Sequence, residues 1–191
     1  MYEVEVKVRA DHDDVRARLA GIDAERRHRV EQVDTYYDAP HRDFADTDEA
    51  LRIRRETVHR GDDEAAEPGD GDSTTTKVTY KGPLVEAESK TREEFETAVA
   101  DADAAEGILA GLGFDPAATV EKERTFYATD GYTVTLDRVA GLGEFVEVER
   151  EAAEADIERV REGAYEVLEA LGLDPAEQIR TSYLGLLLDG Q

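Results

Sequence analysis

The chain of 191 residues contains no cysteine and no tryptophan, a single methionine and only five lysines. Without cysteine, disulfide bonds, thiolate metal sites and cysteine nucleophiles are excluded. No apolar run approaches the ~20 residues of a membrane-spanning helix, and no signal-peptide segment precedes the first strand pattern. We therefore expect one soluble domain over residues 1–191, with a cytoplasmic location and no membrane partner.

Acidic residues outnumber basic residues by 47 to 23, which gives a formal net charge of −24. This charge argues against nucleic acid as a partner, but a small anion could bind where the few bases lie together. Because salt screening makes such a charge tolerable, the composition favours adaptation to a high-salt cytoplasm and an origin in a halophilic archaeon. An acidic protein from a GC-rich genome is the alternative.

Strand patterns separated by turn residues cover much of the chain. They predict eight strands, over residues 2–9, 29–38, 50–58, 76–82, 90–99, 119–128, 132–139 and 144–151. Apolar residues at helical spacing predict helices over about 11–21, 101–112, 155–171 and 176–188. The interval 59–75 is acidic, rich in glycine and without an apolar anchor, so we expect a flexible loop there.

Charged residues alternate with apolar residues along seven of these strands. In the opening EVEVK, Glu3, Glu5 and Lys7 share one strand face and the valines share the other. The corresponding charged positions on later strands are Arg52, Arg54, Lys77, Lys81, Arg92, Glu94, Glu96, Lys122, Arg124, Asp137, Glu147 and Glu149. On any single strand, a solvated face with cross-strand salt bridges explains the pattern. Its recurrence favours one shared ionic face.

The predicted helices can cover the apolar faces of the strands, which leaves the charged faces pointing inward. We therefore predict an α+β fold: a closed eight-stranded antiparallel β-barrel with an ionic lumen and with helices packed on the outside. A barrel of eight strands encloses about one small ligand.

The residue types on the ionic face suit a polyanion and a hard metal ion. Four of the five lysines lie on it, beside arginines that can grip phosphate oxygens as forks. Its carboxylates are the ligands that Mg²⁺ or Mn²⁺ prefers, together with water and phosphate oxygens. The pattern thus indicates a site for a metal ion and an extended anion such as a triphosphate.

These residues resemble the CYTH superfamily, also called the triphosphate tunnel metalloenzymes. Its Glu-x-Glu-x-Lys signature is matched by Glu3, Glu5 and Lys7. The supporting strings are QVDTYYD, ALRIRR, TYKGP, VEKER and LDRVAGLGEFVEVE, in the family's order and over nearly the whole chain. DTYYD and the last string are most similar to the class IV adenylate cyclase branch (CyaB-like proteins), rather than to the vertebrate thiamine triphosphatases.

The resemblance implies roles for particular residues. Divalent metal is expected at Glu3, Glu5, Glu147 and Glu149, with Asp137 joining or supporting them. Triphosphate is expected at Lys7, Arg52, Arg54, Lys81, Lys122 and Arg124. By periodicity, Lys77, Arg92, Glu94 and Glu96 also fit the lumen. The implied ligands are a nucleoside, inorganic or thiamine triphosphate, and a homodimer is common among relatives.

The sequence leaves the reaction open. In one reading, ATP is cyclised to cyclic AMP and pyrophosphate, as in a class IV adenylate cyclase. In the second, water hydrolyses an inorganic or organic triphosphate. A polyphosphate- or nucleotide-binding module without turnover is the third reading.

Overall fold

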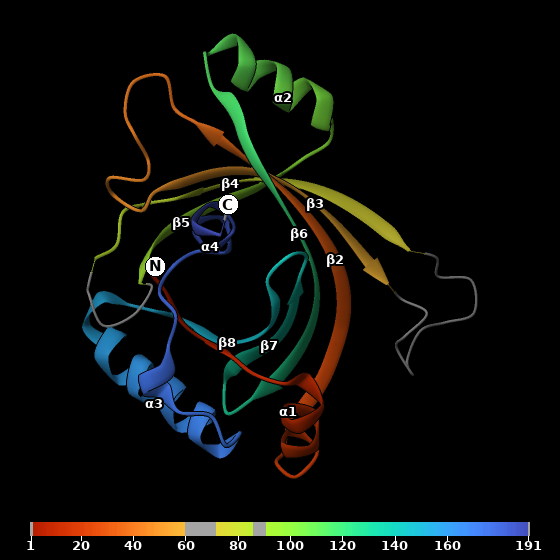
Figure 1. Ribbon diagram of the computed structural model, residues 1–191, viewed down its shortest axis with the longest axis vertical. Helices are drawn as coiled ribbons and strands as arrows, with labels where there is room; N and C mark the ends of the chain where they lie inside the picture. Colours follow the sequence, from red (N-terminus) through yellow and green to blue (C-terminus); the bar gives the residue numbers. More distant parts are fainter. Residues whose placement is uncertain (1, 60–71, 86–90, 191) are drawn as a thin grey trace.

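The computed structural model describes residues 2–59, 72–85 and 91–190. Eight strands form one closed antiparallel barrel in the order β1-β5-β4-β3-β2-β6-β7-β8 (Figure 1). Their bounds are β1 Tyr2–Arg9, β2 Glu25–Asp38, β3 Ala50–His59, β4 Ser73–Lys81, β5 Arg92–Val99, β6 Asp115–Thr129, β7 Tyr132–Val139 and β8 Gly143–Ala152. The predicted barrel is confirmed.

The register of the strands places the charged positions on one common face. Lys7 on β1 lies opposite Glu147 on β8, and Arg124 on β6 lies opposite Asp137 on β7. Directly opposite residues of an antiparallel pair share a face of the sheet. Since the apolar residues between them pack under the helices, the charged side chains face the lumen.

Three helices cover the outer apolar face. α1 (His12–Leu19) and α3 (Ile157–Ala170) pack on one side of the barrel, where α3 contributes the fully buried Leu168 to a cluster with Val6, Val134 and Val148. α2 (Ala102–Gly111) packs near β3 and β4 on another side. A short 3-10 turn, η2 (Glu154–Asp156), precedes α3. In the described residues, no helix has both the length and the apolar character needed to cross a membrane.

The C-terminal segment differs from the single helix predicted over 176–188, and that prediction is wrong. The chain forms a 3-10 turn, η3 (Pro175–Glu177), and then α4 (Tyr183–Asp189). Between them, the backbone N–H of Ile179 donates to the carbonyl of Lys7 (2.7 Å), and the Ser182 hydroxyl caps the new helix. These bonds outweigh the helical pattern of the leucines, and α4 lies over the barrel interior in Figure 1.

The buried residues around α4 form an apolar cluster at one end of the lumen. Tyr183 packs there against inward-facing residues of four strands, which are Tyr36, Val120, Val139 and Phe145. The rings of Phe145 and Tyr183 are 5.0 Å apart at their centroids and meet edge to face. The C-terminal helix therefore covers this end of the barrel.

Strand ends also differ from prediction. β2 begins four residues earlier than expected, and so does β6, in which Pro116 lies opposite Tyr37 beside a register shift. Proline has no backbone N–H to donate to a neighbouring strand, so it is tolerated where the strand pairing is irregular. The β3–β4 hairpin extends into both ends of the interval 59–75, since β3 ends at His59 and β4 begins at Ser73. Near this end of the hairpin, the hydroxyls of Thr57 and Thr74 are 2.9 Å apart. Residues 60–71 of the expected loop lie outside the described residues.

The net charge of −24 predicts a fold that salt stabilises. Like charges repel in the compact state, and the screening length falls from ~10 Å at 0.1 M salt to ~3 Å at 1 M. The melting temperature followed by circular dichroism should therefore rise steadily from 0.1 to 2 M KCl. Matched sucrose solutions are the control for general exclusion effects. A melting temperature that is insensitive to KCl contradicts this expectation.

Candidate functional site

The lumen contains a cavity of about 330 Å³. Of the fifteen side chains predicted for the site, all but Asp137 line this cavity, including Lys77, Arg92, Glu94 and Glu96, which were predicted from periodicity alone. The lining also includes residues that the sequence did not single out, among them Gln32, Glu56 and Tyr183. The barrel thus gathers residues from distant parts of the sequence into one polar chamber.

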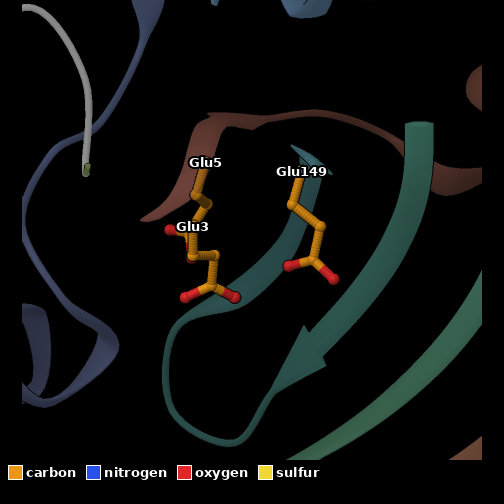
Figure 2. A group of neighbouring side chains, drawn as sticks. All are labelled: Glu3, Glu5 and Glu149. Carbon is orange, nitrogen blue, oxygen red and sulfur yellow. The ribbon is translucent and has the colours of Figure 1, made fainter. Parts of the chain in front are cut away.

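Three carboxylates in the cavity form a group suited to a metal ion. Glu3 and Glu5 on β1 and Glu149 on β8 each place an oxygen within 4.8 Å of the other two (Figure 2). Glu5 and Glu149 are register partners, which brings the two strands' acids together. The three side chains offer the hard oxygens that Mg²⁺ or Mn²⁺ takes. This donor set therefore fits the expected metal.

The electrostatics of this group also favour a cation. Partial burial, followed by repulsion from Glu3 and other nearby carboxylates, raises the pKa of Glu149 to about 8. Burial likewise raises the pKa of Glu3, against the attraction of Lys81. A divalent cation would relieve the repulsion and displace the protons.

The other two predicted metal ligands lie in an ion network around Arg124. The guanidinium donates to both oxygens of Asp137, at 2.7 and 2.5 Å, and to Glu147. Asp137 has no exposed surface and also accepts a hydrogen bond of 2.8 Å from the Tyr183 hydroxyl. Against the effect of burial, Arg124 and Lys7 hold the pKa of Glu147 well below its usual range. In this arrangement Asp137 and Glu147 orient the Arg124 guanidinium. Direct binding of a metal ion by these two acids stays a prediction.

A second ion network holds the arginines of β3. Arg54 donates two hydrogen bonds to Asp34, at 2.6 and 2.7 Å, and Arg52 approaches the same carboxylate at 3.3 Å. Against the effect of burial, the two guanidiniums hold the pKa of Asp34 far below its usual range. The Nε of Arg52 is buried and has no hydrogen-bond partner among the described residues. Arg52 also lies 3.9 Å from Glu94, so Asp34 is shared by both arginines and Glu94 supplements it.

Lys122 is the cation with the least compensation. Its side chain lies on β6 with 7 % of its surface exposed, and no described carboxylate forms a salt bridge with it. Burial, and then the charges of Arg124 and Arg54, lower its pKa to about 7. The attraction of Asp137 and Asp34 opposes this shift only in part, so burial still disfavours the charged ammonium. An anion in the cavity would supply a counterion.

Three other predicted bases, Lys81, Lys77 and Arg92, are paired with acids at short distance. Lys81 lies 3.0 Å from Glu3 and 2.6 Å from Glu94, and Lys77 lies 3.2 Å from Glu96. Arg92 donates to the carbonyl and the carboxylate of Asp48, at 2.5 and 2.6 Å. The charges of these three cations are largely neutralised by their partners, unlike the charge of Lys122. We therefore expect them to bind an anion less strongly.

Two important residues were missed by the sequence reasoning. Asp34 faces the lumen in alternation with Gln32 and Tyr36 on β2, and the string QVDTYYD carries this two-residue spacing. Tyr183 carried no such signal, because it begins a short helix outside the strand pattern.

Comparisons with known proteins agree with this geometry. The profile of the family described as "CYTH domain" matches residues 1–183. A protein of Methanocaldococcus jannaschii named "putative adenylate cyclase" is 36 % identical over 188 residues, which cover 97 % of this chain and 98 % of that protein. The solved PH1819 protein of Pyrococcus horikoshii is 35 % identical, with a TM-score of 0.86 and 99 % coverage of both chains. A Hippeastrum protein, described as a "putative adenylyl cyclase" with a dominant triphosphatase activity, is 18 % identical, with a TM-score of 0.65 and coverage of 100 % and 96 %.

Metal affinity at the three carboxylates should depend on pH. Because the pKa of Glu149 is raised to about 8, Mn²⁺ must displace a proton at neutral pH. Calorimetry should show an apparent affinity that rises up to about tenfold per pH unit between pH 6 and 8, with proton release detected in buffers of different ionisation enthalpy. Glu149→Gln should remove this dependence. An affinity that is independent of pH contradicts the proposed donor set.

The same raised pKa predicts how the metal-free fold responds to pH. The pKa of Glu149 is about 8 in the folded state and has the ordinary value of 4.5 in the unfolded state, so the folded protein binds this proton more tightly. Its contribution to stability is therefore complete below about pH 4.5 and is lost as the pH rises through about 8.

Proposed function

The chain belongs to the CYTH domain family, and on that premise we propose that it is a divalent-metal-dependent enzyme that processes a triphosphate inside its barrel. The observation that carries this proposal is that Lys122 is buried in the cavity lining and forms no salt bridge with any described carboxylate. A triphosphate would place several anionic oxygens beside this ammonium and the unsatisfied Nε of Arg52. Those oxygens would replace the counterions that the protein itself lacks.

The acids and the bases that line the cavity would have different tasks. Glu3, Glu5 and Glu149 would hold Mg²⁺ or Mn²⁺, which when bound supplies charge neutralisation at phosphate oxygens and polarisation of the phosphorus. Arg124 is fixed in orientation by Asp137 and Glu147. A rigid fork and preorganised cations stabilise the charge that develops as a phosphoanhydride bond breaks. The chemistry depends on positioning and charge, so no side-chain nucleophile is required.

Cyclisation of ATP to cyclic AMP and pyrophosphate is our first candidate reaction. The sequence strings resemble the class IV adenylate cyclase branch, and the relative from M. jannaschii carries an adenylate cyclase name. In this reaction the ribose 3′-hydroxyl attacks the α-phosphorus and pyrophosphate leaves. The cations would hold the β- and γ-phosphates in line with the attack.

Hydrolysis of an inorganic or organic triphosphate, such as thiamine triphosphate, is the second candidate. The buried cations favour it, because they can bind phosphate groups whether or not the substrate carries a nucleobase or a ribose. A binding module without turnover is less consistent with the site, because phosphate binding alone does not require the acids Glu3, Glu5 and Glu149. At 18 % identity the Hippeastrum structure supports the fold alone and does not select a reaction.

Source, location and oligomeric state stay predictions from composition and resemblance. We propose a cytoplasmic protein adapted to high salt, and a homodimer by analogy with relatives. Light scattering in molar KCl measures the oligomeric state directly.

Product analysis distinguishes the reactions. The protein is incubated in molar KCl with Mg²⁺ or Mn²⁺ and with ATP, tripolyphosphate or thiamine triphosphate. Cyclic AMP with pyrophosphate identifies a cyclase, and orthophosphate identifies a phosphohydrolase. Absence of product from all three contradicts the enzymatic proposal and favours the binding module.

Removal of one metal-binding carboxylate should separate turnover from binding. Glu149→Gln should lower metal-dependent turnover by about 100-fold and leave tripolyphosphate affinity in EDTA within about threefold. Glu166→Gln, on the exposed face of α3, is the matched control and should retain full activity. Equal losses of turnover and of metal-free binding count against the metal role.

Removal of the uncompensated lysine should stabilise the fold and weaken binding. The pKa of Lys122 falls from 10.5 to about 7 on folding, so the side chain costs stability below about pH 10 and the full cost applies below about pH 7. Lys122→Met should raise the melting temperature at pH 7 by about 3 °C or more and weaken tripolyphosphate binding at least tenfold.

Lys77→Met is the control, because Lys77 lies within 3.4 Å of carboxylates on Glu56 and Glu96. This variant should not gain stability. A Lys122→Met protein that is less stable than wild type refutes the account of this charge.

A further inference from the structure

Tyr183, the first residue of α4, lies against two of the four lysines that line the lumen. The ammonium of Lys7 is 4.2 Å from the centroid of the Tyr183 ring, and the ammonium of Lys122 is 5.1 Å from it. Both distances are within the ~6 Å range of cation–π attraction. The ring is 6 % exposed, and its hydroxyl donates to Asp137 at 2.8 Å. One side chain therefore contacts both lysines and the acid that orients Arg124.

We propose that Tyr183 is a positioning residue of the triphosphate subsite, which holds Lys7 and Lys122 ready for phosphate without neutralising them. The proposal rests on the proposed function. It assigns to the C-terminal segment a part in binding the substrate, in addition to covering one end of the lumen.

The physical reason is the difference between an acid and an aromatic ring as a partner for lysine. A carboxylate fixes an ammonium but cancels its charge, as Glu3 and Glu94 do for Lys81. The face of a ring attracts an ammonium while leaving its N–H donors and its formal charge available. Lys122 has no salt bridge to a described residue, and the acids nearest to Lys7 are only at 3.9 and 4.0 Å. The ring is thus the close contact that the two cations share.

The backbone supports this arrangement. The N–H of Ile179 donates to the carbonyl of Lys7 itself, at 2.7 Å, which ties the approach to α4 to strand β1. Phe145 packs against the Tyr183 ring from β8. The ring is therefore packed against Phe145, and the segment that leads to it is bonded to β1. A purely apolar cover of the lumen would not require contacts between the ring and lysine. Leucine would fill the same cluster but would not attract the ammonium groups.

Two substitutions test the role of the ring. Tyr183→Phe keeps the ring and should leave KM for tripolyphosphate within about twofold of wild type. Tyr183→Leu removes both cation–π contacts and should raise KM about tenfold, with a smaller change in kcat. Equal KM values for the Phe and Leu variants contradict the proposal.

Tyr132 provides a matched control for stability. It is a buried tyrosine on the outer face, whose hydroxyl donates to the carbonyl of Val160 (2.9 Å) and whose ring lies 5.3 Å from the Arg150 guanidinium. Tyr132→Leu should lower the melting temperature as Tyr183→Leu does, but should leave KM unchanged. A KM that rises equally in both leucine variants shows a purely structural effect and overturns the proposal.

A second measurement does not depend on any substrate. Acylation of amines followed by mass spectrometry reports how accessible each lysine is. Lys7 and Lys122 should react faster in Tyr183→Leu than in wild type, Tyr183→Phe or Tyr132→Leu, while the rate at Lys81 stays constant. If wild type binds no triphosphate, the proposed function fails, and this labelling still decides whether Tyr183 holds the lysines. Unchanged rates at Lys7 and Lys122 refute the positioning role.

Discussion

The burial of charge inside a closed barrel is the constraint on which this structure depends. Moving an ion out of water costs several kcal/mol unless partners compensate it. Two bidentate pairs, Arg124 on Asp137 and Arg54 on Asp34, provide part of that compensation. Each joins neighbouring strands of the barrel, because the partners are opposite one another in the register. The strand pairing that closes the barrel therefore also neutralises its interior.

Compensation is incomplete in two places, and these places have opposite sign. Glu3, Glu5 and Glu149 form a negative group, in which burial and repulsion disfavour the carboxylate form of Glu149. Around Lys122, burial and repulsion from Arg124 disfavour the ammonium form. Natural proteins keep such unfavourable arrangements where function needs them. A divalent cation and a polyanion are complementary to these two regions. The same unbalanced charges that weaken the fold without ligands would thus bind the proposed metal ion and triphosphate.

The sequence predicted the barrel and most of its lining because both depend on a two-residue period. Alternation in EVEVK and EFVEVE is sufficient to assign a sheet face to each residue of these two strands. The pairing of β1 with β8 then brings Glu5 beside Glu149. Local pattern could not predict which charges neutralise one another. Glu147 has the same alternation as Glu149, yet it lies with Arg124 rather than with the other two acids. That difference arises from side-chain contacts between strands.

The C-terminal segment shows the same limit. Its leucines predict one helix over 176–188, but a backbone bond to Lys7 and a cap at Ser182 divide it. The tyrosine that begins α4 thereby reaches the lumen. No periodicity in the segment signals this contact, because it depends on where the barrel end lies in space.

The most direct test is a crystal structure of the protein grown with Mn²⁺ and a non-hydrolysable ATP analogue. The account predicts an anomalous peak among the carboxylates of Glu3, Glu5 and Glu149, with phosphate oxygens against Lys122 and Arg52. A lumen that stays free of metal and phosphate, with the analogue bound only to the outer surface, would contradict it.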